Sequence, residues 1–99
     1  MGKVQIKLPS WCVSINAKAS SWITLERKIG KDTKPIDLLT KISMTNSNFR
    51  QSVYNPNAGI ISEQIMVFLN SNLLTFQEMS QIKLTDGDIL MLLPIYFGG

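Results

Sequence analysis

The chain has 99 residues, 44% of them hydrophobic and 17% charged, with one cysteine and no histidine. This composition is typical of one folded domain, and it excludes an internal disulfide, the usual zinc sites and every catalytic triad or dyad that needs an imidazole. The net charge of +3 is not concentrated in a basic run among aromatic residues, which argues against nucleic-acid binding, and no apolar run approaches the roughly 20 residues of a membrane span.

The first third of the chain predicts two strands. Residues 3–8 alternate polar and apolar side chains, which is the period of a half-buried strand. Pro9 ends this run because it has no amide donor. A second alternating run covers residues 22–29. We expect the two strands to pair as a hairpin with a long, irregular connection over residues 10–21.

A helix is predicted after this hairpin. Thr33 offers a capping hydroxyl, Pro35 suits the first helical turn, and Asp37 places a carboxylate near the positive end of the helix dipole. Apolar residues then follow at the three-and-four spacing of a buried stripe. The stripe consists of Ile36, Leu39 and Ile42.

The middle of the chain has no clear period. Polar residues 46–48 end the helical pattern, and residues 49–62 predict an ordered but largely irregular loop. Within this loop, residues 55–59 combine asparagine, proline and glycine, which is typical of a turn.

Three more strands are predicted in the last third, and the middle one is a short strand at Leu73 and Leu74. Residues 65–69 form a short apolar run, and residues 70–72 predict the tight turn that follows it. Residues 76–79 favour a single helical turn. The last strand covers residues 89–93 and is preceded by a turn at residues 84–88, where a glycine can adopt positive φ.

Strand parity in the first and last of these strands predicts a docking surface. Side chains alternate between the two faces of a sheet, so if Leu90 and Val67 face the helix, their neighbours form an apolar patch on the open face. The patch consists of Met66, Phe68, Ile89, Met91 and Leu93, and the predicted surface continues into Ile95, Tyr96 and Phe97. Exposed apolar patches mark interfaces, and methionine suits more than one partner. Alternatively, residues 49–62 fold over this face and bury it.

The sequence ends on Gly98 and Gly99. A glycine pair is the only dipeptide without side chains, so the active site of another protein can enclose it on all sides. We expect a domain at residues 1–94 and a flexible tail at residues 95–99. The six residues after Leu93 can extend over about 20 Å.

Several features in this order resemble the ubiquitin-like sulfur-carrier family, which includes the small subunit of molybdopterin synthase and the sulfur carrier of thiamin thiazole synthesis. The most specific are an Asp-Gly-Asp turn at residues 86–88, an apolar strand, Pro94 and the terminal glycine pair. The resemblance covers essentially the whole chain. It implies an α+β fold of the β-grasp (ubiquitin-like) type, in which a mixed sheet of four to five strands with parallel central pairing packs on one helix. The chain departs from the family in its long loop at residues 49–62 and its bulky residues 95–97.

The resemblance also implies a function. The chain is expected to be a protein cosubstrate or non-catalytic small subunit that binds no cofactor. An E1-like adenylating enzyme would use ATP to adenylate the Gly99 carboxylate, and sulfur would replace AMP to give a thiocarboxylate. A sulfur-accepting synthase subunit would then receive the sulfur for cofactor biosynthesis, with molybdopterin or tungstopterin favoured. One alternative is a ubiquitin-like modifier joined through Gly99 to target lysines, and another is an interaction domain with an inert tail.

The remaining expectations concern the environment of the chain and single residues. A lone cysteine and a charged amino terminus favour the cytoplasm, and we expect a monomer when the chain is free. Cys12 is expected to be a buried small residue rather than a persulfide relay, since no cationic cluster surrounds it in the sequence. Asp86 and Asp88 are expected to form turns, and Trp11 and Trp22 to pack at the sheet edge.

Overall fold

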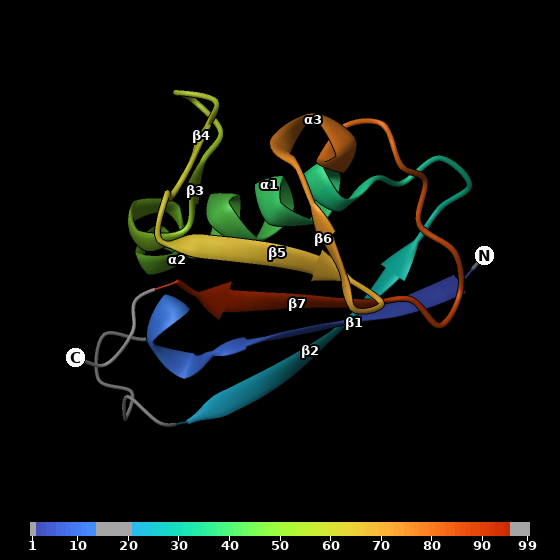
Figure 1. Ribbon diagram of the computed structural model, residues 1–99, viewed down its shortest axis with the longest axis horizontal. Coiled ribbons are helices and arrows are strands. Elements are labelled where there is room, and N and C mark those ends of the chain that lie inside the picture. Colours follow the sequence, from blue (N-terminus) through green and yellow to red (C-terminus); the bar gives the residue numbers. More distant parts are fainter. Residues whose placement is uncertain (1, 14–20, 96–99) are drawn as a thin grey trace.

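The structure is a computed structural model that describes residues 2–13 and 21–95. Five strands form one mixed sheet in the order β2-β1-β7-β5-β6 (Figure 1). Their bounds are Gly2–Pro9 for β1, Trp22–Ile29 for β2, Ile65–Leu69 for β5, Asn72–Leu74 for β6 and Ile89–Pro94 for β7. The central strands β1 and β7 are parallel, and all other neighbours are antiparallel. This topology is the β-grasp fold that the resemblance implies.

The helices and a small second sheet complete the fold. Helix α1 spans Pro35–Thr45, and three shorter elements are the 3-10 helix η1 (Ser10–Cys12), α2 (Ser47–Ser52) and α3 (Phe76–Met79). A two-stranded sheet pairs β3 (Tyr54–Asn55) with β4 (Ile60–Ile61). The prediction of one helix that covers the sheet is therefore confirmed by α1. The shorter helix α2 was not predicted.

The core lies between α1 and one face of the five-stranded sheet. Alternate residues of β1 and β7 are almost completely buried there, and α1 contributes the facing stripe. The main members are Val4, Ile6, Leu8, Leu38, Leu39, Ile42, Leu90 and Leu92, none more than 4% exposed. The burial of alternate strand residues confirms the predicted parity of both strands.

The segment at residues 49–62 contains more regular secondary structure than predicted, since it includes most of α2 and the strands β3 and β4. Asn46 ends α1 and also caps α2, where its side-chain oxygen accepts from the Phe49 N–H at 2.9 Å. Phe49, Val53 and Tyr54 are buried in the main core, and α2 and β3 pack against α1. The β3–β4 hairpin rises beside these helices (Figure 1). The segment therefore packs on the helix side, and the alternative in which it buries the open face is wrong.

The start of α1 also differs from the prediction. The N-cap residue is Lys34, and its N–H donates to the Asp37 carboxylate at 2.9 Å. The Thr33 hydroxyl instead accepts from the Gly30 N–H at 2.8 Å. Thr33 thus closes the turn before the helix. Asp37 lies in the first turn as expected, and its carboxylate also satisfies a backbone donor at the helix start.

Two turns lie next to each other at one end of strands β5 and β7: the turn between β5 and β6, and the turn that precedes β7. Asn70 and Ser71 have φ of 49° and 74°, as in the two-residue hairpin turn that matches the twist of paired strands. The Asn70 side chain accepts from the Ile89 N–H at 2.9 Å and donates to the Asp88 carboxylate at 2.8 Å. Asp88 also accepts from the Thr85 N–H. These bonds fix the start of β7 and confirm the turn role of Asp88.

The first strand is held closely against the other turn aspartate. The Lys3 N–H donates to the Asp86 carboxylate at 2.9 Å, and a Cβ at Gly2 would lie 2.7 Å from Asp86 Cβ. We therefore expect Gly2→Ala to lower the free energy of unfolding by about 1–3 kcal/mol, because backbone must shift to relieve the overlap. Urea unfolding would measure the loss. The control is Gly30→Ala, whose Cβ would meet only the Thr33 hydroxyl at 3.6 Å, and an equal loss in both variants would contradict the steric explanation.

Candidate docking face and carboxyl-terminal segment

The strands of the sheet expose an open face on the side away from α1. The five side chains predicted for the docking surface all lie on it, and each is partly exposed. Their strand neighbours Val67, Leu90 and Leu92 are at most 2% exposed. Parity therefore places the predicted side chains correctly, and a docking role for them stays a prediction.

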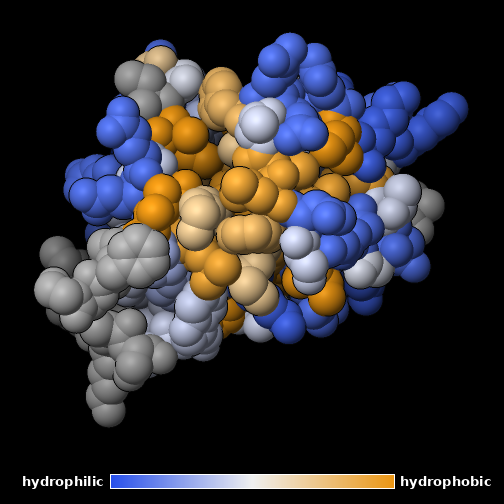
Figure 2. Space-filling view, in the orientation of Figure 1, coloured by the Kyte–Doolittle hydropathy of each residue, from blue (hydrophilic) through white to orange (hydrophobic). Residues whose placement is uncertain are grey.

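Cross-strand pairing shows how this face is composed. In one row across the sheet, Lys7 of β1 lies beside Met91, Met91 beside Phe68, and Phe68 beside Leu73 of β6. Leu73 is 57% exposed, so it extends the apolar area beyond the predicted set. We call this apolar area, over β7, β5 and β6, the apolar half. It consists of Met66, Phe68, Leu73, Ile89, Met91 and Leu93. Figure 2 shows apolar side chains gathered at the middle of this view with hydrophilic residues around them.

The other half of the open face is polar. On β1 and β2, the side chains that alternate with the buried residues are polar except for Trp22. They are Lys3, Gln5, Lys7, Thr24, Glu26 and Lys28. Trp22 begins the edge strand β2 and is 49% exposed, so about half of its surface is covered at the sheet edge. Trp11 lies on η1 and packs against the core.

A groove runs along the boundary of the two halves. It has a volume of about 350 Å³ and is lined by Lys7, Phe68, Asn70, Ser71, Ile89, Met91 and Leu93. Four of these lining residues are apolar, and the polar ones are Lys7 and the turn residues Asn70 and Ser71. Concave apolar surfaces with a few polar groups are the usual form of a binding site.

The last strand leads from this face toward the end of the chain. The Ile95 N–H donates to the Gln64 carbonyl at 2.8 Å, so strand-like bonding continues one residue past β7. Tyr96, Phe97, Gly98 and Gly99 lie outside the described residues. The predictions made for these four residues stay predictions.

The thiol is buried, and the acidic residues in the described part of the chain form no metal-binding cluster. Cys12 is fully buried, and this burial raises the pKa of its thiol to about 12, so it is protonated and unreactive at neutral pH. Within residues 2–13 and 21–95, no three histidine, cysteine, aspartate or glutamate side chains are close enough to hold a metal ion. None of the described helices has the length and apolar character needed to cross a membrane.

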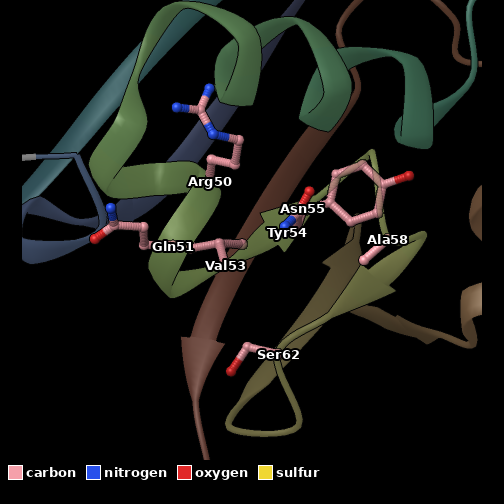
Figure 3. A pocket seen from close by; sticks show the side chains of 7 residues that line it. All are labelled: Arg50, Gln51, Val53, Tyr54, Asn55, Ala58 and Ser62. Atoms are coloured by element: carbon pink, nitrogen blue, oxygen red, sulfur yellow. The ribbon is translucent and has the colours of Figure 1, made fainter.

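A larger hollow of about 430 Å³ lies beside α2 and the β3–β4 hairpin, lined by Arg50, Gln51, Val53, Tyr54, Asn55, Ala58 and Ser62. The side chains around it do not converge on a common point (Figure 3). Arg50 is the charged side chain among the described lining residues, and it donates to the Ser43 carbonyl near the end of α1 at 3.0 Å. Among the described residues that line this hollow, no second charged side chain accompanies Arg50.

Comparisons with known proteins identify relatives by fold. No family model and no curated protein matches the sequence. Among solved structures, the chain is similar to small archaeal modifier protein 1 from Haloferax volcanii, with a TM-score of 0.69, 19% identity and coverage of 99% of this chain and 100% of the other. The small archaeal modifier protein 1 from Methanosarcina acetivorans gives a TM-score of 0.62 at 19% identity, covering 100% and 98%.

A third similar structure belongs to a Pyrococcus furiosus protein provisionally assigned as molybdopterin converting factor, subunit 1. It has a TM-score of 0.62 and 17% identity, with coverage of 95% of this chain and 98% of the other. At these identities the likeness establishes the fold. The matches cover nearly all of each compared chain.

Proposed function

We propose that this chain, with the β-grasp fold of the small archaeal modifier proteins and a molybdopterin converting factor subunit, is a sulfur carrier that acts through Gly99. The observation that carries the proposal is the combination of this fold over the full length with a terminal glycine pair just beyond the strand that lines the open face. The proposal takes Gly99 as the last residue of the mature chain.

The proposed chemistry activates a poor electrophile. A free terminal carboxylate is ionised at neutral pH and does not accept a nucleophile readily. One oxygen of the Gly99 carboxylate attacks the α-phosphorus of ATP, and pyrophosphate leaves. A sulfide equivalent then attacks the acyl carbon and AMP leaves, so a C–S bond replaces a C–O bond. An adenylating enzyme supplies every catalytic group in these steps.

The chain itself contributes binding and delivery. The apolar half of the open face can hold a partner, since it combines exposed apolar area with a groove. Six residues separate Leu93 from the terminus, and they can reach about 20 Å when extended. A partner bound on the face can therefore receive the carboxylate in an active site of its own.

The proposal is tested by ATP–pyrophosphate exchange with the adenylating enzyme of the same organism. The wild-type chain should support exchange. A variant that lacks Gly99 should support none, because its new terminal carboxylate, on Gly98, ends about 3.3 Å short of the reacting position. Exchange at the wild-type rate without Gly99 would show that activation does not require the Gly99 carboxylate.

A modifier function is the second candidate, because two of the similar structures are small archaeal modifier proteins. Both functions begin with the same adenylate, but the modifier then forms an amide with lysine side chains. Immunoblots of native cells separate them: a ladder of heavier species that disappears without Gly99 indicates a modifier, and a single band indicates a carrier.

Phe68→Lys tests whether the apolar half binds the adenylating enzyme. Phe68 is partly exposed in the middle of that half, so we expect at least about tenfold weaker binding, because an ammonium replaces apolar contact area. The melting temperature should change little. Calorimetric titration measures the affinity, and Met44→Lys is the control because Met44 is 70% exposed on α1. Equal affinity of the two variants would count against the face.

A further inference from the structure

We infer that the open face selects a partner that presents an apolar side chain bordered by a carboxylate, and that Lys7 recognises that carboxylate. This inference rests on the proposed function, because it specifies the chemistry of the partner that binds the same face. It concerns Lys7, which lies on β1, outside the strands that form the apolar half.

The position of Lys7 places a charge at the edge of the groove. Lys7 pairs in register with Met91 across the parallel strands β1 and β7, and both residues line the groove with Phe68. Lys7 is partly buried, whereas Lys3 on the same strand face is exposed. A lysine in this setting covers apolar surface with its methylene stem and holds its ammonium at the rim.

The ammonium of Lys7 forms no ion pair in the described part of the chain. Lys3 lies 3.7 Å from the Glu26 carboxylate, and Lys83 lies 3.1 Å from that of Asp32. Lys7 forms no such ion pair with residues 2–13 or 21–95. Its charge is therefore available to a group that arrives with a partner.

A partner that fills the groove must also satisfy this charge. An apolar surface that covers the groove would remove water from the Lys7 ammonium and leave it unpaired, which opposes binding. A carboxylate beside the inserted apolar side chain would offset that cost and form a charge-assisted hydrogen bond. The face thus discriminates between partners by the presence of this carboxylate.

Charge also argues against a second copy of the chain as the occupant. The polar half carries three lysines and one glutamate, which are Lys3, Lys7, Lys28 and Glu26. Two copies that pack through this face would bring lysines toward lysines, and like charges at an interface are unfavourable. A partner with an acidic surface would instead bring carboxylates toward these lysines, which is favourable.

The test uses charge reversal with a matched control. Lys7→Glu should weaken binding to the recombinant adenylating enzyme of the same organism by about tenfold at low salt, and by only about twofold at 0.5 M salt, since ions screen rim charges. Lys7→Met, which keeps the apolar stem, should lose less. Lys41→Glu makes the same charge change at an exposed position on α1 and should bind as the wild type does.

Distinct outcomes overturn the inference or the proposed function. Equal affinities for Lys7→Glu and Lys41→Glu at low salt would overturn the role of Lys7, even if deletion of Gly99 still abolished activation. Self-association of the free wild-type chain in sedimentation velocity, abolished by Phe68→Lys, would show that a second copy occupies the face. Loss of binding in Lys7→Glu with no activation of wild-type Gly99 would support the inference and overturn the proposed function.

Discussion

Replacing Gly98 with leucine is expected to lower the rate of adenylate formation by at least about 100-fold while the chain folds normally. In the proposed function, the glycine pair enters a narrow channel of the adenylating enzyme, and a side chain there displaces the carboxylate from its productive position. The described core residues all lie between Val4 and Leu92, so a change at Gly98 should leave the melting temperature nearly unaltered. ATP–pyrophosphate exchange measures the rate.

A graded series makes this prediction stricter. Gly98→Ala should reduce the rate less than Gly98→Leu, because the obstruction grows with side-chain volume. Both variants should still bind the adenylating enzyme through the open face with nearly the wild-type affinity. The loss should therefore appear in the exchange rate measured at saturating concentrations of the chain. Wild-type exchange rates for Gly98→Leu would refute the steric role of the glycine pair.

Phe49→Ala is expected to destabilise the domain by about 3–5 kcal/mol. Phe49 is fully buried, and α2 brings its ring into the same core as α1 and the sheet. Because small domains have a total stability of about 5–15 kcal/mol, this loss should lower the melting temperature by more than about 10 °C. Thermal unfolding followed by circular dichroism measures the shift.

The matched control for this prediction is another phenylalanine. Phe76 on α3 is 44% exposed, and its ring centroid lies 6.4 Å from that of Tyr54. Phe76→Ala should therefore cost less than about 2 kcal/mol, since less apolar area returns to water. A small loss in Phe49→Ala would mean that residues 49–62 behave as the irregular loop that the sequence predicts.

The sheet could be predicted from the sequence because its pattern is local. Strict alternation in β1 and β2 identifies two strands, and a buried face is implied by the same alternation. In β7 the residues on both faces are apolar, so hydropathy does not show which face is buried. Strand parity is then the basis for assigning residues to the helix side and to the open face. The burial of Leu90 and Leu92 against the partial exposure of Met91 shows that this assignment is correct.

Helix α2 could not be predicted from periodicity because it is too short. Six residues form fewer than two turns, so no buried stripe can repeat. A weaker signal was present: Asn46 precedes Phe49 by three residues, which suits a cap, and Phe49 and Val53 are spaced by four. Tertiary packing of these two side chains gives the segment its order.

The composition of the open face depends on long-range pairing, which the sequence pattern does not contain. Lys7 belongs to the groove only because β1 and β7 are parallel and in register, and these strands are more than eighty residues apart. Leu73 joins the apolar half through the register of the β5–β6 hairpin. A two-residue turn at Asn70 and Ser71 would have predicted that register, since turn length sets strand pairing.

The most direct test of the central claim is the intact mass of the chain purified from its native cells. A sulfur carrier should show a population in which sulfur replaces one oxygen atom of the carboxylate, in a chain that ends on Gly99. Oxidation of any of the five methionines adds nearly the same mass, so fragmentation must place the increment on Gly99. An unmodified Gly99 under every growth condition, or a mature chain that does not end there, would contradict the account.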